Sequence, residues 1–437
     1  MTPLSPQPPP DAARPAGRQT YSRRRFLIRT AAAGAAGLAG VPARLLGGSG
    51  RVTPTEAFDP VIESFMAARK VPGGALAIVR RKRIVYGQGY GWADRERKIP
   101  VHPDSLFRIA SISKPITAVA VLQMAEQGRL DLDAKAFDLL PLKPVLASGR
   151  EPDPRLRRIT VRHLLQHTGG WDREKSFDPM FRPGVIAKAV GVPAPAGPEA
   201  VIRYMLGQPL DFDPGTRYAY SNFGYCVLGR ILERLSGQSY AQLVQERVLA
   251  PIGIQRMQLG ATQDGRQADG EVRYYTSDND QAQSVFPGSA GKVPMPYGGF
   301  NLEAMDAHGG WIASAIDLAR FAAALEDPAR CPLLRPASFD TLSAPPPAPA
   351  SRQADGTLEA HYYGCGWMIR PVAGRDGKMN FWHSGSLPGT ATLLVRRWDG
   401  LSWAVLFNQR SEDEKLPDHA IDPALHQAAD AVTDWAG

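Results

Sequence analysis

The sequence contains few cysteines, and their spacing points to no shared role. Cys226, Cys331 and Cys365 are the three cysteines among 437 residues, and neither a CxxC pair nor a Cys/His metal spacing occurs. Three thiols cannot all pair, so we expect core or surface thiols rather than a disulfide framework. The sequence also has no Gly-x-Ser-x-Gly and no phosphate-cradling glycine loop, and the first of these absences argues against an α/β-hydrolase nucleophile elbow.

Long hydrophobic runs are also missing. The most apolar segment near the start, residues 31–46, consists mostly of Ala and Gly and is interrupted by Pro42 and Arg44, whereas a membrane anchor needs about 20 strongly apolar residues. It follows Ser-Arg-Arg-Arg-Phe-Leu at residues 22–27 and contains Val-Pro-Ala at residues 41–43. This order resembles a bacterial twin-arginine export signal. We therefore predict a signal peptide at residues 1–43 and a periplasmic or extracellular protein, with retention as an anchor as the alternative.

The body of the chain has little surplus charge. The formal net charge is +8, but residues 1–43 contain six arginines and one acid, and the remainder has 45 basic and 42 acidic residues, a net charge of +3. Because the basicity lies mostly in the leader, the composition gives no basic patch for a nucleic-acid partner. We also expect no membrane partner once the signal is cleaved.

Strand patterns occur near both ends of the predicted mature chain. Residues 74–79 and 83–90 are β-rich runs joined by a basic turn, which predicts a hairpin. Residues 390–397 and 402–407 flank Asp399-Gly400, a strong hairpin signal, and residues 364–370 and 378–383 flank another turn. The pattern predicts a mostly antiparallel sheet built from both termini and flanked by helices, an α/β (α+β) fold.

Helical patterns fill the middle of the chain. Residues 112–127 have apolar positions at helical spacing and end before Gly128. Asp59-Pro60 predicts a helix start, with the helix ending near Lys70, and Asp422-Pro423 predicts the start of the last helix. We predict a discontinuous α/β domain of residues 50–105 and 300–437, an inserted helical domain of residues 106–299, and an active site between them. Residues 286–300 and 344–350 are predicted to be loops.

The first candidate for chemistry is a Ser-x-x-Lys motif at Ser111 and Lys114. Residues three apart on a helix share a face, so the hydroxyl and the amine can meet. A serine hydroxyl needs a neighbouring base, and a lysine serves when burial or another cation lowers its pKa. The helix start also offers free N–H groups to a developing oxyanion. The alternative is an N-cap serine with an exposed lysine, and Ser289 and Lys292 match the same motif by chance in a Gly/Pro-rich loop.

Two further motifs supply partners for Ser111. Tyr220 and Asn222 form the one Tyr-x-Asn in the chain, just before a helical pattern. A phenol beside a lysine ammonium loses its proton more easily and becomes a general base, and Asn222 can bond both the lysine and a substrate amide. The alternative is a packed tyrosine in a helix-opening loop. His383 and Gly385 end a predicted strand, where a glycine lets a substrate lie close to the backbone.

These motifs, in this order, resemble the penicillin-recognising serine hydrolase superfamily in its class C β-lactamase branch, with D-aminopeptidase, D-Ala-D-Ala carboxypeptidase and family VIII esterase relatives. The likeness runs from about Phe58 to Phe407. It extends to the residues around the motifs, namely Phe107 to Ala110, Leu164 to Gly170, Gly309-Gly310-Trp311 and Asp317 to Phe321.

The resemblance implies a role for each matching residue. Ser111 attacks a carbonyl to form an acyl-enzyme, and Lys114 and Tyr220 move its proton. The backbone N–H groups of Ser111 and Ser386 form the oxyanion hole. The remaining substrate-binding positions are Asn222, His383 and Gly385. The resemblance implies no metal and no organic cofactor, and as partner a small-molecule or peptide substrate, peptidoglycan-derived peptides included.

One departure from the family bears on specificity. β-Lactamases and transpeptidases of this family usually have Lys-Thr-Gly at the third motif, and here His383 replaces the lysine. A histidine is largely neutral at pH 7, so recognition of a substrate carboxylate should be weaker. We therefore favour an esterase, amidase or D-peptidase, with a class C-like β-lactamase and a low-turnover penicillin or peptidoglycan-peptide sensor as alternatives. His163 and His167 have a zinc-like spacing, but the resemblance makes them structural.

Overall fold

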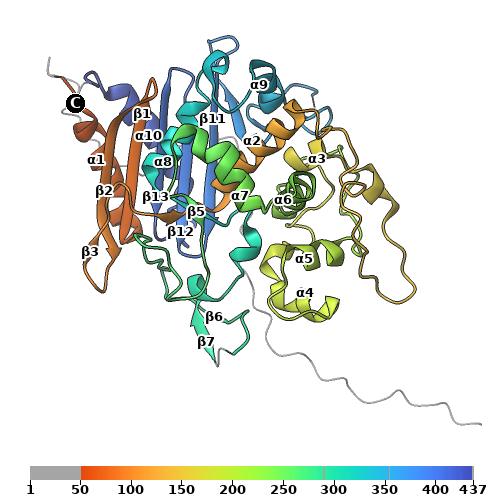
Figure 1. The fold of residues 1–437 in the computed structure, drawn as a ribbon. Helices are drawn as coiled ribbons and strands as arrows, with labels where there is room; N and C mark the ends of the chain where they lie inside the picture. The colour runs from red at the N-terminus through yellow and green to blue at the C-terminus, as the bar shows by residue number, and fades with distance from the viewer. Residues whose placement is uncertain (1–50, 289–290, 354, 436–437) are drawn as a thin grey trace, which may run out of the picture. The chain divides into compact units, whose positions relative to one another are not determined.

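The computed structural model describes residues 51–437 apart from 289–290, 354 and 436–437 (Figure 1). The predicted export signal therefore lies outside the described residues, as does Ser289 of the second Ser-x-x-Lys motif. Across the described part of the chain, no helix is long and apolar enough to cross a membrane.

An eight-stranded sheet joins the two ends of the described chain, as the sequence predicted. Its strand order is β3-β2-β1-β13-β12-β11-β10-β9, and every neighbouring pair is antiparallel. The N-terminal strands are β1 (Gly73–Arg80), β2 (Arg83–Asp94) and β3 (Ile99–Pro100). The C-terminal strands are β9 (Tyr362–Tyr363), β10 (Met368–Pro371), β11 (Met379–Leu387), β12 (Thr390–Arg396) and β13 (Leu401–Phe407). The predicted hairpins β1–β2, β10–β11 and β12–β13 all form.

Helices cover both faces of this sheet, which explains why β1 and β13 near its centre consist mostly of apolar residues. Leu76 and Ile78 of β1 pack with α1 (Pro54–Arg69) and α10 (Ile421–Ala431), whereas Ala75 and Ala77 face the core that contains α8 (Ala315–Ala324). All seven residues of β13 are buried. A strand that alternates its side chains between two buried faces needs apolar residues at every position.

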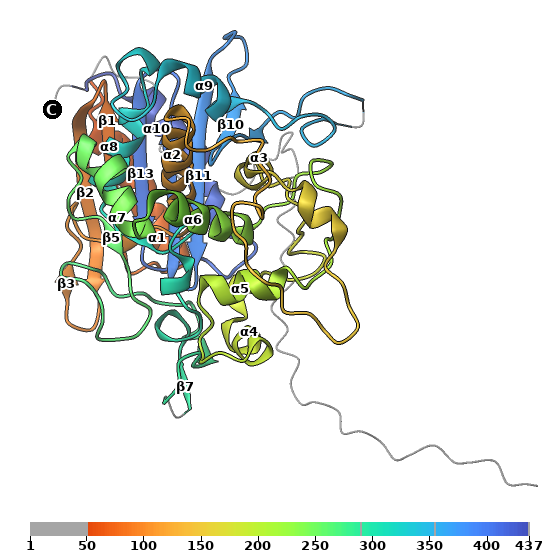
Figure 2. The same ribbon diagram turned by 45° about the vertical axis from the view of Figure 1, so that its right-hand side comes forward.

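The middle of the chain supplies the remaining helices: α2 (Ser113–Glu126), α3 (Val161–Leu165), α4 (Pro183–Val190), α5 (Pro198–Met205), α6 (Asn222–Ser236), α7 (Tyr240–Val244) and α9 (Pro336–Ser343). Figures 1 and 2 show α3, α4 and α5 to one side of the sheet. One hydrophobic cluster runs from the sheet through α2 to α6. A second, smaller sheet consists of the short strands β4 (Phe107–Arg108), β8 (Trp311–Ala313) and β5 (Gln258–Leu259), in that order.

Three sequence-based boundaries differ from the structure. α1 begins at Pro54, because Thr53 and Glu56 form a capping box in which the Glu56 carboxylate accepts from the Thr53 N–H at 2.9 Å. The expected cap, Asp59, instead accepts a hydrogen bond from the Tyr90 hydroxyl at 2.7 Å. The final helix begins two residues before Pro423, the expected first helical residue, at Ile421. Within residues 286–300, expected to be a loop, β7 (Lys292–Pro294) pairs with β6 (Gln281–Gln283).

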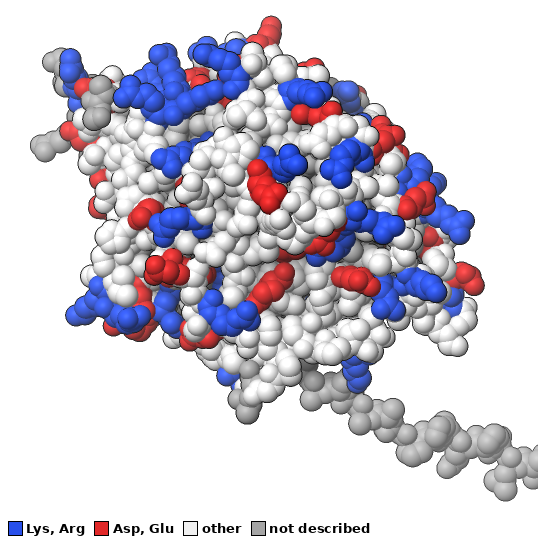
Figure 3. All heavy atoms as spheres, in the orientation of Figure 1, with Lys and Arg blue, Asp and Glu red and all other residues white. Residues whose placement is uncertain are grey.

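Charged side chains of both signs are spread over the surface. On the face drawn in Figure 3, Lys and Arg lie beside Asp and Glu over most of the central and lower surface. The ion pairs between exposed groups include Arg158 with Asp213 at 2.7 Å and Arg256 with Asp104 at 3.1 Å.

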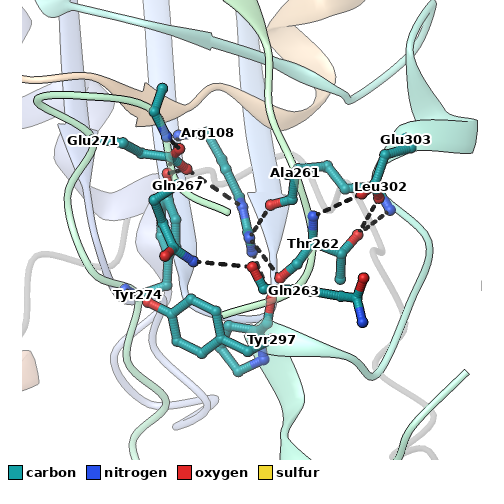
Figure 4. Close-up of polar contacts among 12 residues, drawn as sticks. Arg108, Ala261, Thr262, Gln263, Gln267, Glu271, Tyr274, Tyr297, Leu302 and Glu303 are labelled. Carbon is teal, nitrogen blue, oxygen red and sulfur yellow. Dashed lines mark hydrogen bonds and ion pairs between the residues drawn. The ribbon is translucent and has the colours of Figure 1, made fainter. Parts of the chain in front are cut away.

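A buried arginine ties the strand before Ser111 to a long connecting segment. The guanidinium of Arg108 is fully buried and donates to the carbonyl oxygen of Pro296 at 2.7 Å. It also donates to the carbonyl oxygen of Ala261 at 2.8 Å (Figure 4). Its Nε lies 3.9 Å from the buried carboxylate of Glu271, which accepts from the Tyr274 hydroxyl at 2.7 Å. Burial raises the pKa of Glu271, and the Arg108 charge opposes that rise.

Replacing Arg108 by methionine is therefore expected to destabilise the fold by about 3–5 kcal/mol, because carbonyl acceptors and the Glu271 carboxylate lose a buried partner. Arg256→Met is the matched control, since it removes an exposed ion pair worth at most about 1 kcal/mol. Urea unfolding followed by tryptophan fluorescence measures both. Equal losses in the two variants would refute the structural role given to Arg108.

Candidate active site

Ser111 lies in a short turn between β4 and α2, the 3-10 helix Ala110–Ile112. Ala110 has a φ of 48°, in the left-handed region that residues with a side chain rarely adopt. Hydrogen bonds hold the preceding residue on both sides: the Ile109 N–H donates to the Trp311 carbonyl at 3.0 Å, and the Thr392 hydroxyl donates to the Ile109 carbonyl at 3.1 Å. Strain of this kind persists where surrounding structure enforces it, most often at functional sites.

Lys114 is one helical turn further along and fully buried. Its Nζ lies 3.0 Å from Ser111 Oγ, 2.8 Å from Asn222 Oδ1 and 3.0 Å from the carbonyl oxygen of His308. This geometry rules out the alternative of a capping serine with an exposed lysine. Burial lowers the pKa of Lys114 well below its usual value; the charge of Arg173 adds to this and that of Asp178 opposes it.

The three contacts of Lys114 match the hydrogen-bonding capacity of a neutral amine. A neutral amine has two N–H donors and one lone pair. The amide oxygen of Asn222 and the carbonyl of His308 can only accept, so they take the two N–H groups. In the neutral form the lone pair is then left for the hydroxyl hydrogen of Ser111, whereas in the ammonium form Nζ donates to Ser111 Oγ as well. The arrangement can accept a proton from the serine.

Tyr220 completes the group around Ser111. Its ring centroid lies 4.7 Å from Lys114 Nζ, and its hydroxyl hydrogen-bonds the Ser111 side chain. The structure differs here from the expectation of an easily ionised phenol: burial raises the pKa of Tyr220, and the interaction with the Ser111 side chain offsets only part of this. A protonated phenol is a donor, so Tyr220 can supply a proton where Lys114 takes one.

His383 lies in β11, but its side chain is already occupied. Nδ1 lies 2.7 Å from the Ser384 carbonyl, which only accepts, so this nitrogen carries the hydrogen and Nε2 accepts from the Tyr363 hydroxyl at 2.9 Å. Burial and the charge of Lys114 lower the pKa of His383 to about 3. The ring is neutral and 3% exposed. Both ring nitrogens of His383 therefore have partners within the protein.

Gly385 and Ser386 follow on the same strand, which lies beside the turn that contains Ser111. A Cβ placed on Gly385 would come within 2.3 Å of the Ile109 carbonyl oxygen and 3.1 Å of the Ala110 Cβ. Only glycine therefore lets β11 pack this close to the residues before Ser111. Ser386 is exposed, and its hydroxyl accepts from Arg410 at 3.4 Å.

Several residues of the site carried no clear sequence signal. The Asp178 carboxylate accepts from Asn222 Nδ2 at 2.6 Å, and the Arg173 guanidinium lies 5.1 Å from the Tyr220 ring centroid. Both come from the loop after Gly170, whose path the sequence does not reveal. His308 had no assigned role, and it contributes its backbone carbonyl. An Asp-Pro cap pattern at Asp178 was the available hint.

The histidine pair with zinc-like spacing serves local structure. His163 Nδ1 accepts from the Thr160 N–H at 3.2 Å in a capping box. His167 is buried, and its Nδ1 accepts from the Ser221 N–H at 3.2 Å, next to the Tyr-x-Asn motif. Within the residues that the structure describes, no group of three or more His, Cys, Asp or Glu side chains is gathered for a metal ion.

A cavity of about 430 Å³ lies away from these residues. It is bordered by Asp94 to Arg97, Arg273 to Thr276 and Tyr297, among others, and by none of the predicted site residues. The case for an active site at Ser111 therefore rests on the bonds among its side chains rather than on the size of a cavity.

Comparison with curated proteins finds hydrolase and penicillin-binding relatives. Esterase EstB of Burkholderia gladioli is 33% identical over 244 residues, which is 55% of this chain and 59% of EstB, so the match spans less than two thirds of that protein. Penicillin-binding protein 4* of Bacillus subtilis (strain 168) is 25% identical over 359 residues, covering 78% of this chain and 69% of that protein.

Solved structures and a family model match a larger part of the chain than EstB does. The D-amino acid amidase from Ochrobactrum anthropi SV3, complexed with L-phenylalanine amide, has a TM-score of 0.64 at 21% identity, covering 87% of this chain and 98% of that one. This likeness shows a shared fold. The family model described as Beta-lactamase matches residues 58–427. The chain therefore belongs to the beta-lactamase family, within the penicillin-recognising serine hydrolases that the sequence motifs indicated.

Proposed function

We propose that the protein is an exported serine hydrolase that forms an acyl-enzyme on Ser111 and cleaves an ester, an amide or a D-amino-acid peptide bond. The contact between Ser111 Oγ and the buried Lys114 Nζ, 3.0 Å apart, carries this proposal. A buried, neutral amine in contact with a serine hydroxyl is a base matched to its nucleophile. The leader pattern at residues 22–46 supports export by the twin-arginine route.

In the proposed reaction, Lys114 takes the Ser111 proton as Oγ attacks the carbonyl carbon of the substrate. The new ammonium then has three N–H groups for Asn222 Oδ1, the His308 carbonyl and Ser111 Oγ. Tyr220 gives its proton to the leaving group and regains one from Lys114. A water molecule then attacks the acyl-enzyme by the same proton path in reverse, which frees Ser111.

The oxyanion that forms in each step needs donors placed in advance. We assign this role to the backbone N–H groups of Ser111 and Ser386, because β11 is packed against the nucleophile turn through Gly385. Such donors typically supply roughly 3–4 kcal/mol each to the transition state.

Substrate preference follows from the third motif. His383 is neutral, and both its ring nitrogens have partners within the protein. It therefore offers no cation to a substrate carboxylate, which penicillins and D-Ala-D-Ala peptides carry. We infer that esters and amides are preferred over β-lactams, in keeping with the name of the relative EstB. The second candidate, a sensor that is acylated without turnover, is favoured by likeness to penicillin-binding protein 4*.

The nucleophile is tested by Ser111→Ala with p-nitrophenyl butyrate, D-alanine p-nitroanilide and nitrocefin as substrates. Loss of the attacking oxygen is expected to lower kcat by at least about 10³-fold. Mass spectrometry of quenched reactions is expected to find one acyl group on the unsubstituted protein, on the peptide that contains Ser111.

Ser289→Ala is the matched control, because it removes the serine of the second Ser-x-x-Lys motif, and its activity should be unchanged. Turnover that survives in Ser111→Ala would refute the acyl-enzyme mechanism. A Ser111 that is acylated but releases no product with any substrate would replace the hydrolase by the sensor.

His383→Lys tests the basis of substrate preference. A lysine here would supply the missing cation, so kcat/KM for nitrocefin is expected to rise relative to kcat/KM for p-nitrophenyl butyrate, by about tenfold if the added ion pair contributes about 1.4 kcal/mol. The ratio is used because it does not depend on the fraction of folded protein. His361→Lys, on the approach to β9, is the control. An unchanged ratio would mean that His383 does not set the preference.

A further inference from the structure

The loop that follows Gly170 brings a carboxylate to the far side of Asn222. We propose that Asp178 is a positioning residue, which fixes the orientation of the Asn222 amide and thereby aims the lone pair of Lys114 at Ser111. The inference rests on the proposed function of Ser111 and Lys114, and it assigns a role to a residue outside the three sequence motifs.

The chemistry of the two contacts allows one orientation of the amide. The Asp178 carboxylate only accepts hydrogen bonds, so the NH₂ end of Asn222 must face it, as it does at 2.6 Å. The amide oxygen is then directed at Lys114 Nζ, 2.8 Å away. In the flipped amide, an oxygen would face the carboxylate, and an N–H would face Lys114 and compete with Ser111 for its lone pair. Asp178 therefore keeps that lone pair available.

Asp178 is itself held in place by a backbone contact. Its Oδ1 accepts from the Met180 N–H at 3.1 Å and caps the 3-10 helix Pro179–Phe181, while its Oδ2 binds Asn222. The Asp178 carboxylate thus caps a helix and also binds Asn222, which contacts Lys114 and through it Ser111. Because both oxygens are used, the loop position and the amide orientation are set together.

The charge of Asp178 also acts on the base. It is the anion that favours the ammonium form of Lys114, against burial and the charge of Arg173. The other titratable groups that face Lys114 or sense its charge are Tyr220, Tyr225, His167, His308 and His383. Burial lowers the pKa values of the three histidines, so they carry no charge at neutral pH. Asp178 and Arg173 are therefore the charges that tune Lys114 among these groups.

Two substitutions separate positioning from capping. Asp178→Ser keeps a good helix cap but shortens the side chain so that it no longer reaches Asn222. Asp178→Asn removes the charge and has one acceptor oxygen in place of two, so it can accept from Asn222 only by giving up the cap. Asp327 is the matched control, because it caps the 3-10 helix Pro328–Arg330 through the same Asp-Pro arrangement, accepting from the Ala329 N–H at 3.0 Å.

The full-length variants are assayed on p-nitrophenyl butyrate as a function of pH. Asp178→Ser is expected to lower kcat by about 100-fold with little change in KM, since the base is misdirected while the substrate site remains. Asp178→Asn should keep more activity and move the acidic limb of the pH profile of kcat/KM to lower pH. The sign follows because removing an anion lowers the pKa of Lys114 further, and the neutral amine is the active form.

Asp327→Ser is expected to leave kcat and the pH profile unchanged. The inference is overturned if Asp178→Ser keeps full activity, if it loses no more than Asp327→Ser, or if Asp178→Asn leaves the acidic limb in place. These failures differ from failure of the proposed function, in which Ser111→Ala itself remains active.

Discussion

An amine that is removed from water loses the hydration that stabilises its charged form, and at Lys114 this loss favours the neutral amine that the proposed mechanism needs as its base. The side chain is fully buried, yet every contact it makes suits a neutral amine: two obligate acceptors for its N–H groups and one hydroxyl for its lone pair. In the proposed reaction the proton comes from Ser111, and the same three oxygens become the acceptors of an ammonium. The contacts of Lys114 thus suit the charge that the proposed reaction forms.

The rest of the fold serves to hold this arrangement. Strands from the two ends of the described chain meet at β1 and β13, and the resulting sheet places β11 against the turn that contains Ser111. Asn222 begins α6, and His308 comes from the segment before β8, so the three partners of Lys114 belong to three separate elements. Arg108 holds the strand that precedes Ser111 to a distant connecting segment. Because these elements share one hydrophobic core, a shift of one changes the distances among all of them.

Much of this was predictable from local patterns. Turn residues between apolar runs predicted the hairpins, and Ser111, Lys114, Tyr220 and Asn222 were found from motifs that the structure brings together. The start of α1 was misplaced because Asp-Pro resembles a cap even inside a helix. Asp178, Arg173 and the His308 carbonyl could not be found, since their positions depend on loops whose conformation is set by long-range packing. The motif identified His383 but not the hydrogen bond of its ring to Tyr363. That partner is twenty residues away in the sequence, so no local pattern predicts the contact.

The protonation state of Lys114 in the resting protein tests its proposed role as the base most directly. Lysine labelled with ¹³C at Cε gives NMR signals that move as each amine titrates, and the Lys114→Met variant identifies the signal of Lys114 by its loss. We expect this signal to titrate well below the usual lysine pKa, as the proposed role of Lys114 as a base requires. A Lys114 that titrates at or above the usual value would contradict its role as the base.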